Sequence, residues 1–498
     1  MPVYRHLGID TGNEYVIFIR MDSEICLSEG FEALTRVSVT HKKRSIVASI
    51  QVITDTHILD TGEASLSISA SNALKIKEGE RLVISHLSEI KSIRHVRSKI
   101  YGNDLSNQQF TEIIADIVEG KYANVHLSAF ITACAGDSLS TDEITGLTKA
   151  MVEAGEKMKW KGDIIADKHC VGGLPGNRTT PIVVSIIAAA GLVIPKTSSH
   201  AITSPAGTAD MMSVITRVKL RLDEMKAVVN EEGGCIVSGE QYLSPADDII
   251  IRVERALDID SEGQMIASVL SKKAAAGSTH LIIDIPVGPT AKVRSEENAE
   301  KLKFYFKVVG KALGIRMKIL ITDGREPIGS GIGPALEAMD VLAVLRNEKD
   351  SNTKLREKSL MLSGQLLELA KKASEGKGYS VAKSILESGA AFEKFVSICN
   401  AQGGFHEPQY AVHKKQVLAR KSGVVTSIDN RKLAKLAKLA GAPSDPSAGV
   451  HFEAFLGRKI SKGDVLYTIY AESPGELDYA LNYLSDENHI ITLDGRES

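Results

Sequence analysis

DIIADKHCVGGLPGNRTTPIVVSIIAAAGLVIPKT, residues 163–197, is the stretch that decides the fold of this chain. The apolar run at 163–167 predicts a strand, and the glycine-rich residues 171–180 predict a loop. The apolar residues 181–191 predict a helix, and LVIPKT at 192–197 predicts a second strand. Repeats of strand, loop and helix favour an α/β fold with a mostly parallel sheet, whose ligand sites lie at the carboxyl ends of the strands.

The sequence on either side of this stretch predicts further regions. β-formers separated by polar turns dominate the first 90 residues, and short strands between Gly-containing turns return near the C-terminus. Capping boxes at Ser106 with Gln109 and at Ser140 with Glu143 open amphipathic helices. We therefore expect an N-terminal β-rich module over 1–90, a helical domain over 96–158 and 248–276, an α/β domain over 162–245 and 280–410, and a C-terminal α+β region over 411–498.

Charge and hydropathy exclude several classes of partner. The 498 residues carry 60 Lys plus Arg against 62 Asp plus Glu, a formal net charge of −2. This balance gives no reason to expect a nucleic-acid or anionic-membrane partner, so any bound anion needs a local site. The most apolar stretch, 182–194, is shorter than the roughly 20 residues that span a bilayer. We therefore expect no membrane segment.

The cysteines indicate a reducing compartment. The chain has 5 cysteines, scattered without a CxxC pair. An odd, sparse set argues against a disulfide framework and a zinc cluster, and suits the cytosol. The N-terminal residues MPVYRHLGIDTGNEY show no charged segment followed by an apolar segment, as a secretion signal would. We expect a cytoplasmic enzyme without a metal site.

The glycine-rich loop at 167–180 is the first candidate anion site. Its three glycines let backbone N–H groups turn inward, and Lys168 adds a full charge at the end of the predicted strand. Thr179 or Thr180 is expected to cap a helix that opens at Pro181, and a helix N-terminus attracts phosphate. The alternative is an ordinary tight turn with a buried Lys–Asp pair.

The segment KTSSHAITSPAGT at 196–208 is the second candidate. Five hydroxyl groups precede a predicted helix there, and hydroxyls bind phosphate oxygens without adding charge. The alternative is a solvated Ser/Thr-rich loop with a capping Thr. Two such loops after adjacent strands favour a site more strongly together than either does alone.

The segment SVLSKK at 268–273 is the third candidate. Ser268 and Lys272 are four positions apart, so they share one face of a predicted helix. The alternative is a solvated helix end, where lysine is favoured by the helix dipole.

The glycine-rich segment GSGIGP at 329–334 does not predict a dinucleotide site. The third glycine of the GxGxxG pattern would fall on Pro334, so the dinucleotide fingerprint fails. We expect a glycine-rich turn of the α/β domain there, and no cofactor.

At these segments the chain resembles the thymidine phosphorylase family, the pyrimidine-nucleoside phosphorylases. It is most similar to the long type 2 members, which are related to archaeal AMP phosphorylases. The likeness covers about residues 96–490, whereas the first 90 residues match only the long subgroup. The similar motifs are DKHCVGGLPGNRTT (the family's DKHSTGG loop), KTSSHAITSPAGTADMMS, ASVLSKKAAAG (the base-binding ASILSKK helix), EPIGSGIGPALEAMD, and the C-terminal series GVVTSID, AGVHF and GDVLYTIYA.

The resemblance implies a nucleoside phosphorylase/phosphoribosyltransferase-like fold, in which a helical domain and a mixed parallel-sheet α/β domain close on a substrate cleft. It implies a homodimer or higher homo-oligomer built through the helical domain. It also implies a thymidine phosphorylase-like pentosyltransferase: phosphate attacks C1′ of a pyrimidine nucleoside, expected to be thymidine, and releases a base and a pentose 1-phosphate. Inorganic phosphate is then a co-substrate. Such a protein must position two reactants and stabilise charge on the departing base.

The resemblance also assigns residues to the site. The expected phosphate ligands are Lys168, Gly173, Thr179, Ser198, Ser199 and Thr208. The expected contacts to the nucleoside are His200, Thr203, Ser204, Arg252, Ser268, Lys272 and Lys292. The proton for the base is expected from His169 or from Asp260, which is at the donor position of the AMP phosphorylase branch. The alternative role for His169 is that of a packed core residue, and the alternative role for Asp260 is that of a helix cap.

Departures from the family pattern leave other functions open. Cys170 stands where shorter members have a serine ligand, and a thiol is a weaker donor. His200 stands where relatives carry arginine, which removes a permanent charge. Asp260 and the N-terminal module favour a second function, the phosphorolysis of nucleoside 5′-monophosphates such as AMP. A non-catalytic phosphosugar-binding protein is the third.

Overall fold

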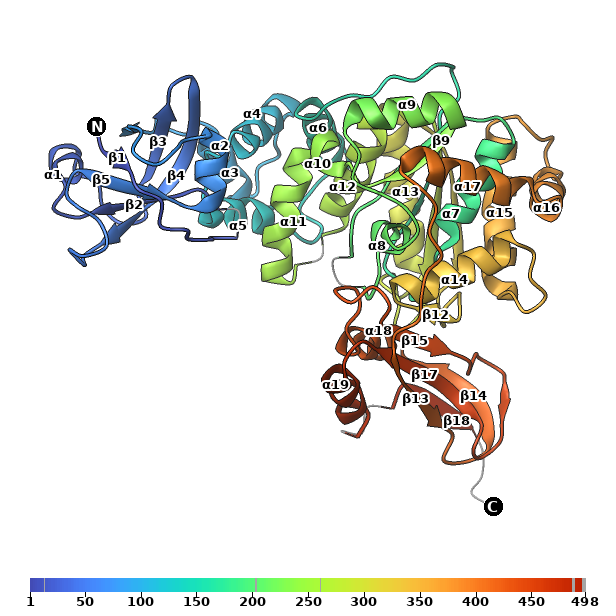
Figure 1. The fold of residues 1–498 in the computed structure, drawn as a ribbon. Helices are drawn as coiled ribbons and strands as arrows, with labels where there is room; N and C mark the ends of the chain where they lie inside the picture. The colour runs from blue at the N-terminus through green and yellow to red at the C-terminus, as the bar shows by residue number, and fades with distance from the viewer. Residues whose placement is uncertain (13, 202–203, 260, 486–488, 495–498) are drawn as a thin grey trace. The chain divides into compact units, whose positions relative to one another are not determined.

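The structure, a computed structural model, describes residues 1–12, 14–201, 204–259, 261–485 and 489–494 (Figure 1). The chain divides into two units. Unit 1 comprises Met1–Ala154 and Ala246–Ser261, and unit 2 comprises Gly155–Pro245 and Glu262–Ser498.

The boundary between the units divides residues 248–276, which the sequence analysis placed in the helical domain. Residues up to Ser261 lie in unit 1, whereas α12 (Glu262–Ala275) lies in unit 2. The packing of α12 explains the difference. Ala275 and Ala276 share a hydrophobic cluster with Val228, a residue of the α/β part of the chain.

The N-terminal part of unit 1 is a β-rich module. Its six strands lie in the order β1-β5-β2-β4-β3-β6. Buried and partly exposed residues alternate along β3, as expected of a sheet with one face on a core. The elements are β1 (Val3–Tyr4), β2 (Val16–Arg20), α1 (Glu24–Glu29), β3 (Arg36–His41), β4 (Arg44–Ile53), β5 (Glu63–Leu66), α2 (Ile68–Leu74) and β6 (Val83–His86).

The rest of unit 1 is helical. Both predicted capping boxes are confirmed: Ser106 and Gln109 begin α4, and Ser140 and Glu143 begin α6. Each box satisfies two backbone N–H groups that a helix start leaves unpaired. The helices are α3 (Ile93–Ile100), α4 (Asn107–Val118), α5 (Asn124–Ala133), α6 (Thr141–Glu153) and α11 (Pro245–Leu257).

Unit 2 contains the predicted parallel sheet. β7 (Ala166–Cys170) pairs with β10 (His280–Val287), which pairs with β11 (Arg316–Asp323), and both pairings are parallel. β8 (Ile194–Thr197) and β9 (Gly234–Val237) form a second parallel pair. A parallel bridge between Ile165 and Val193 links the segments that lead into β7 and β8.

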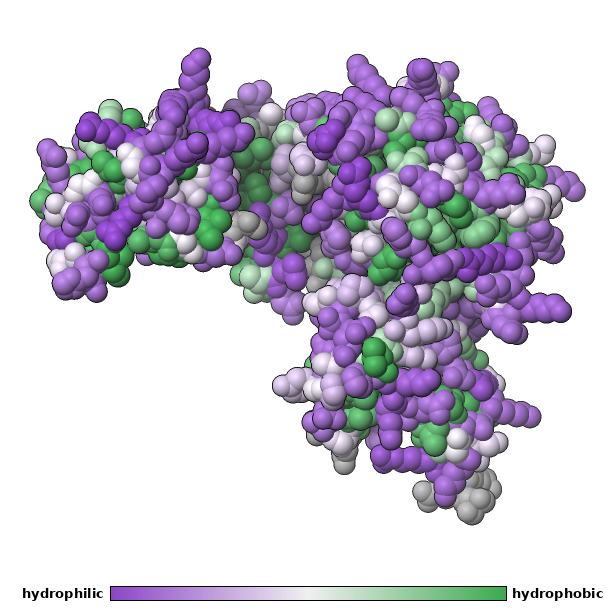
Figure 2. Space-filling view, viewed as in Figure 1, coloured by the Kyte–Doolittle hydropathy of each residue, from purple (hydrophilic) through white to green (hydrophobic). Residues whose placement is uncertain are grey.

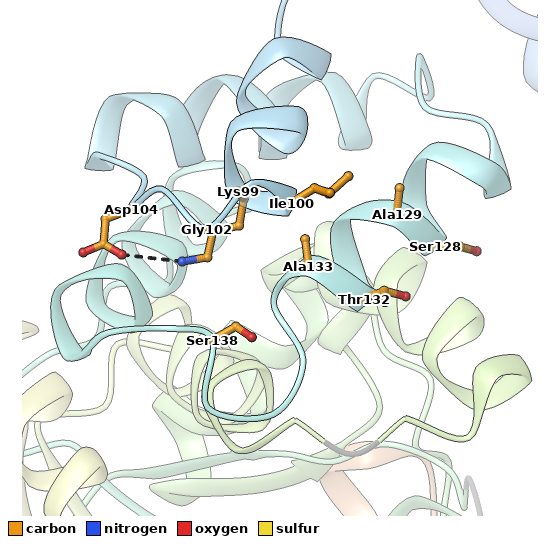
Figure 3. Close-up of a pocket in the computed structure, with 9 residues that line it drawn as sticks. All are labelled: Lys99, Ile100, Gly102, Asp104, Ser128, Ala129, Thr132, Ala133 and Ser138. Atoms are coloured by element: carbon orange, nitrogen blue, oxygen red, sulfur yellow. Dashed lines mark ion pairs between the residues drawn. The ribbon is translucent and has the colours of Figure 1, made fainter.

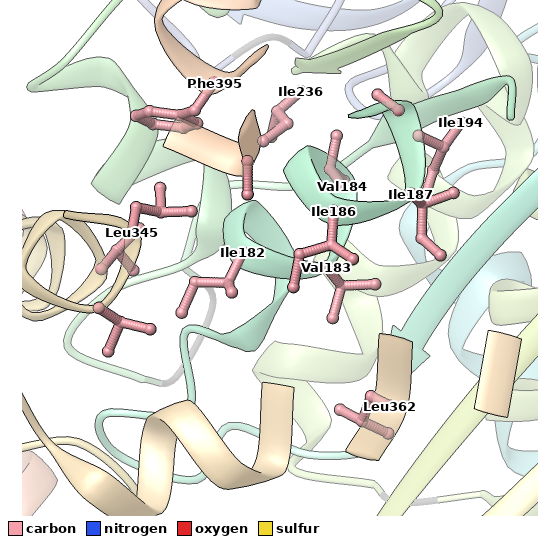
Figure 4. Close-up of a cluster of buried hydrophobic side chains, with 14 of the residues drawn as sticks. Ile182, Val183, Val184, Ile186, Ile187, Ile194, Ile236, Leu345, Leu362 and Phe395 are labelled. Carbon is pink, nitrogen blue, oxygen red and sulfur yellow. The ribbon is translucent and has the colours of Figure 1, made fainter. Parts of the chain in front are cut away.

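A buried helix anchors the glycine-rich loop of unit 2. Every residue of α7 from Thr179 to Ala188 is buried, because the helix is apolar on all sides. Ile182, Leu362 and Phe395 belong to one cluster around it (Figure 4). The other helices here are α8 (Thr208–Ser213), α9 (Leu222–Glu232), α10 (Glu240–Leu243), α13 (Glu296–Ala312), α14 (Pro334–Leu345), α15 (Thr353–Leu369), α16 (Gly378–Glu387) and α17 (Ala390–Gln402).

The C-terminal part of unit 2 adds two small sheets. One has the order β12-β15-β17-β13 and the other β16-β14-β18. The predicted strands in GVVTSID, AGVHF and GDVLYTIYA are confirmed as β14, β15 and β17. The elements are β12 (Gly331–Ile332), β13 (His413–Leu418), β14 (Gly423–Ile428), α18 (Asn430–Leu439), β15 (Gly449–Phe452), β16 (Lys459–Ile460), β17 (Val465–Ala471), α19 (Pro474–Ser485) and β18 (Ile491–Asp494).

The surface is mostly polar. Figure 2 shows hydrophilic side chains over most of the viewed face, with apolar ones in small groups between them. Within the described part of the chain, no helix has both the length and the apolar character that crossing a membrane requires.

Candidate active site

The strand β7 carries the first candidate residues. The sequence predicted a strand at 163–167 with Lys168 at its end, but β7 covers Ala166–Cys170, so Lys168 and His169 lie within it. Parallel pairing with β10 continues as far as Cys170 opposite Asp284, which explains the longer strand. Both side chains are therefore held by a sheet rather than by a loop.

The side chain of Lys168 contacts the first residues of α7. Its side chain is buried, and its Nζ donates to Thr179 Oγ1 at 2.8 Å and to Thr180 Oγ1 at 3.4 Å. The prediction that one of these threonines caps a helix opening at Pro181 is wrong, because α7 begins at Thr179 itself and has no side-chain cap. The hydroxyls face the lysine instead.

The cation of Lys168 lies among other buried charges. Burial lowers the pKa of Lys168, the charges of Lys358 and Arg178 lower it further, and Cys170 and Asp284 oppose this. Asp284 Oδ2 lies 2.9 Å from Lys358 Nζ, and Asp284 Oδ1 accepts from Thr322 Oγ1 at 2.6 Å. Asp284 is thus already neutralised by Lys358. The ammonium group of Lys168 contacts the threonine hydroxyls of α7.

Cys170 is a protonated thiol. Burial, and then the charge of Asp284, raise the pKa of Cys170 to about 12. Its Sγ donates to Asp284 Oδ2 at 3.3 Å and accepts from Asn177 Nδ2 at 3.0 Å. The thiol therefore links β7, β10 and the glycine-rich loop, and it is not a nucleophile.

His169 is a neutral imidazole in this state. Burial lowers the pKa of His169 well below its ordinary value, and the charges of Lys273, Lys196, Lys272 and Lys168 lower it further. A neutral imidazole donates a hydrogen bond but carries no proton to release as an acid. A bound dianion would reverse the electrostatic part of this shift.

Asp167 lies close to two further lysines. Asp167 Oδ2 lies 3.1 Å from Lys273 Nζ and accepts from Ser278 Oγ at 2.9 Å. Lys196 Nζ, on β8, lies 4.0 Å from Asp167 Oδ1. One carboxylate therefore faces the ammonium groups of two neighbouring elements, α12 and β8.

The second loop contacts the first through Arg178 and through the packing of Gly173 against Ser204. Arg178 Nη1 donates to Thr208 Oγ1 at 3.1 Å, and its Nε pairs with Glu337 on α14. A Cβ built on Gly173 would lie 3.1 Å from Ser204 Cβ, and a Cβ on Gly172 would lie 2.9 Å from Lys292 Cβ. The two loops thus pack closely at Gly173 and Ser204, whereas Lys292 belongs to neither loop; Gly172 also has a φ of +92° that favours glycine.

The outer residues of the second loop are organised by Asp210. Ser198 is partly exposed, and Ser199 and His200 are exposed. His200 Nδ1 lies 2.6 Å from Asp210 Oδ1, and Gly207 N donates to Asp210 Oδ2 at 2.8 Å. His200 therefore has an acidic partner in the first turn of α8.

The residues expected to bind the nucleoside are only partly brought together. Lys272 Nζ, on α12, donates to Ser268 Oγ at 3.3 Å, as their spacing predicted. Arg252 is exposed on α11 in unit 1, and Arg252 Nη2 lies 3.5 Å from Asp248 Oδ2 one turn earlier. Asp260 and Thr203 lie outside the described residues.

Buried charge in unit 2 is unbalanced. Among its described residues, the buried carboxylates are Asp167, Asp284 and Glu337. The buried cations are Lys168, Arg178, Lys196, Lys272, Lys273 and Lys358. A buried ammonium or guanidinium group attracts an anion more strongly than an exposed one, so these cations favour an anionic ligand. The contacts above place these residues in separate small groups, of which Asp284 with Lys358 and Asp167 with Lys273 are ion pairs.

The sequence analysis assigned no site role to several of these buried residues, namely Asp167, Arg178, Lys196, Lys273, Asp284, Glu337 and Lys358. The signal for Asp167, Arg178, Lys196, Lys273 and Glu337 was present, because each lies inside a quoted motif. Asp284 and Lys358 lie in ordinary strand and helix patterns that carry no local signal. No group of three His, Cys, Asp or Glu side chains in the described ranges could hold a metal ion.

Family models match three segments of the chain. Residues 162–392 match the glycosyl transferase family a/b domain, and residues 93–155 match the helical bundle domain of the same family. Residues 424–491 match the pyrimidine nucleoside phosphorylase C-terminal domain. A crystal structure of anthranilate phosphoribosyltransferase from Thermus thermophilus is similar in fold, with a TM-score of 0.50 and 18% identity over 62% of this chain and 98% of that chain.

Similar curated proteins extend over almost the whole chain. A protein of Hahella chejuensis is 53% identical over 98% of this chain and 97% of its own length. One of Legionella pneumophila strain Corby is 52% identical over 98% of this chain and 95% of its own length. Both carry the name "Putative thymidine phosphorylase". The chain therefore belongs to the thymidine phosphorylase family, the pyrimidine-nucleoside phosphorylases, and is a pentosyltransferase of that glycosyltransferase type.

Proposed function

We propose that the protein catalyses the reversible phosphorolysis of thymidine to thymine and 2-deoxy-α-D-ribose 1-phosphate. The buried ammonium group of Lys168, with the hydroxyls of Thr179 and Thr180 beside it, supports this proposal more than any other single observation. Inorganic phosphate is a dianion, and a preorganised set of ammonium groups and hydroxyls binds it without reorganisation. The names of the relatives point to the same substrate.

In this proposal Lys168 and the hydroxyls of Thr179 and Thr208 hold phosphate, with Gly173, Ser198 and Ser199 at the edge of the loops. A phosphate oxygen attacks C1′, the bond between C1′ and the base nitrogen breaks, and its electron pair leaves with the base. The protein supplies no nucleophile, so its contribution is to position the reactants and to stabilise charge.

The base end of the site is proposed at His169, Ser268 and Lys272. Burial, and then the charges of Lys273, Lys196 and Lys272, lower the pKa of His169. A cation and a hydrogen-bond donor stabilise the negative charge that develops on a departing pyrimidine. Phosphate binding would raise the pKa of His169, because it introduces negative charge among the lysines. Proton donation to the base by His169 then requires bound phosphate.

The proposal is tested by incubating the purified protein with thymidine, with and without phosphate, and measuring thymine by chromatography. Phosphate-dependent thymine release is expected. Release of no base from any pyrimidine nucleoside or nucleotide would contradict the proposal and would favour a non-catalytic phosphosugar-binding protein.

A second candidate substrate is a nucleoside 5′-monophosphate, which would give ribose 1,5-bisphosphate. Lys292 favours it, because this exposed residue packs against Gly172 at the surface of the phosphate loop. His200 disfavours it, because its partner Asp210 is an acid that would repel a second phosphate. Turnover of AMP or CMP with thymidine inert would reverse the order of the two candidates.

We also propose a homodimer formed through unit 1. A surface hollow of about 700 Å³ there is lined by small residues such as Ala129 and Ala133 (Figure 3). Ile100, Tyr101 and Val125, on α3 and α5 or next to them, are 56%, 78% and 70% exposed. Exposed apolar side chains of this size are typical of a protein interface. Val125→Glu should give a monomer in analytical ultracentrifugation if this face is the interface.

A further inference from the structure

Arg178 connects the two candidate phosphate loops and is nine-tenths buried. Its Nη1 donates to Thr208 Oγ1 at 3.1 Å, and its Nη2 donates to the carbonyl of Ala206 at 2.9 Å. Its Nε pairs with the carboxylate of Glu337, which comes from α14. A single guanidinium therefore binds the second loop at two points while α14 holds it in place.

The direction of these hydrogen bonds has a chemical consequence. A guanidinium only donates, so Thr208 Oγ1 must accept, and the hydroxyl hydrogen of Thr208 is left to point elsewhere. Lys168 Nζ imposes the same direction on Thr179 Oγ1 and Thr180 Oγ1, at 2.8 and 3.4 Å. Phosphate dianion oxygens only accept. The cations therefore orient threonine hydroxyls as donors, which is the polarity that an anion requires.

We propose that Arg178 is a positioning residue for phosphate. It orients the hydroxyl of Thr208, and that hydroxyl contacts phosphate. This inference rests on the proposed function. Lysine could not replace arginine, because one ammonium group cannot reach Thr208, Ala206 and Glu337 in the planar geometry of a guanidinium. Glu337 contributes by fixing the guanidinium, and its Oε1 also accepts from Gly176 N in the first loop at 3.4 Å.

The test is a double-mutant cycle with Arg178→Met and Thr208→Val, in which the KM for phosphate is measured at saturating thymidine. Each single substitution should raise this KM about tenfold to a hundredfold, as expected for a hydrogen bond involving a charged group. The double variant should be no worse than the poorer single variant, because Arg178 acts through Thr208. Multiplicative effects, or an unchanged KM in Arg178→Met, would overturn the proposal.

Folding is controlled with a compensated variant. Arg178→Met leaves Glu337 buried without its partner, so Arg178→Met/Glu337→Gln is made as well, and the cycle is repeated in the Glu337→Gln background. Arg356→Met is the matched control, since Arg356 contacts Asn347 and Glu387 but neither loop. It should lose its ion pair and keep the KM for phosphate.

A binding readout separates this inference from the proposed function. Inorganic phosphate should raise the thermal unfolding temperature of the wild type, and Arg178→Met/Glu337→Gln and Thr208→Val should each lose most of this shift. A wild-type protein that is inactive but still stabilised by phosphate would contradict thymidine phosphorolysis. The role of Arg178 in phosphate binding would then still be tested by the variants. Equal phosphate stabilisation of the wild type and both variants would overturn the role of Arg178.

Discussion

Lys358 Nζ lies 2.9 Å from Asp284 Oδ2, and both side chains are buried. Burial alone would raise the pKa of Asp284, but the charges of Lys358 and Lys168 hold it below its ordinary value. Lys358 thus neutralises a carboxylate whose charge acts on the predicted phosphate lysine, Lys168. The pair comes from α15 and β10, two elements that are remote from the phosphate loops in sequence.

Lys358→Met should therefore reduce both stability and phosphate affinity. The free energy of unfolding should fall by about 3 kcal/mol, the lower end for a broken buried pair, because Lys168 and Thr322 still face Asp284. Asp284 would then neutralise Lys168, and the KM for phosphate should rise. Urea unfolding and steady-state kinetics measure the two effects. Adding Asp284→Asn should restore most of the stability, and a single variant as stable as the wild type would contradict this reading.

Lys168→Met should remove turnover without unfolding the protein. Losing one charged phosphate contact should cost about 2–4 kcal/mol of transition-state stabilisation, or roughly 30- to 1000-fold in rate. The free energy of unfolding without phosphate should not fall, because the substitution replaces a buried cation by an apolar side chain. The ion pair between Asp284 and Lys358 remains. Calorimetry with and without phosphate checks both statements. Near-normal kinetics would show that phosphate binds elsewhere.

His169→Asn should flatten the loss of stability in acid. The folded state keeps His169 neutral, whereas the unfolded chain takes up a proton below a pH of about 6.5, so stability falls as the pH drops below that value. One such histidine contributes up to about 1.4 kcal/mol per pH unit in this window. Urea unfolding at pH 7.5, 6.5 and 5.5, compared with the wild type, isolates this contribution from the other histidines. Identical slopes for the two proteins would contradict it.

Cys170 should resist alkylation in the folded protein. Its pKa is raised to about 12, so at pH 8 the thiolate is about a thousandfold scarcer than in a free cysteine. Peptide mapping after iodoacetamide treatment should find Cys170 unmodified in the native protein and modified in urea. Rapid modification of Cys170 in the native protein would show that the thiol is activated. That result would contradict a protonated thiol that donates to Asp284.

The sequence was sufficient for features that depend on local pattern. The boxes at Ser106 and Ser140 were predicted because each involves residues three positions apart, and the burial of α7 followed from its continuous apolar run. Boundaries were less certain. β7 extends to Cys170 because of its pairing with β10, and that pairing depends on residues more than a hundred positions away.

The candidate site was predictable only in part for the same reason. Lys168 and Thr179 lie in one loop motif and were predicted together as phosphate ligands, and the structure brings them into contact, although Thr179 was also expected to act as a cap. Arg178 and Glu337 are 159 positions apart, and neither has a partner that spacing could suggest. Residues brought together by the tertiary fold leave no periodic signal in the sequence.

The division of the chain into two units affects how the protein is made. Residues 246–261 complete unit 1, yet they are translated after residues 155–245 of unit 2. A nascent chain therefore holds an unfinished unit 1 while the first strands of unit 2 emerge from the ribosome. Neither unit can reach its final form as an independent early product of synthesis.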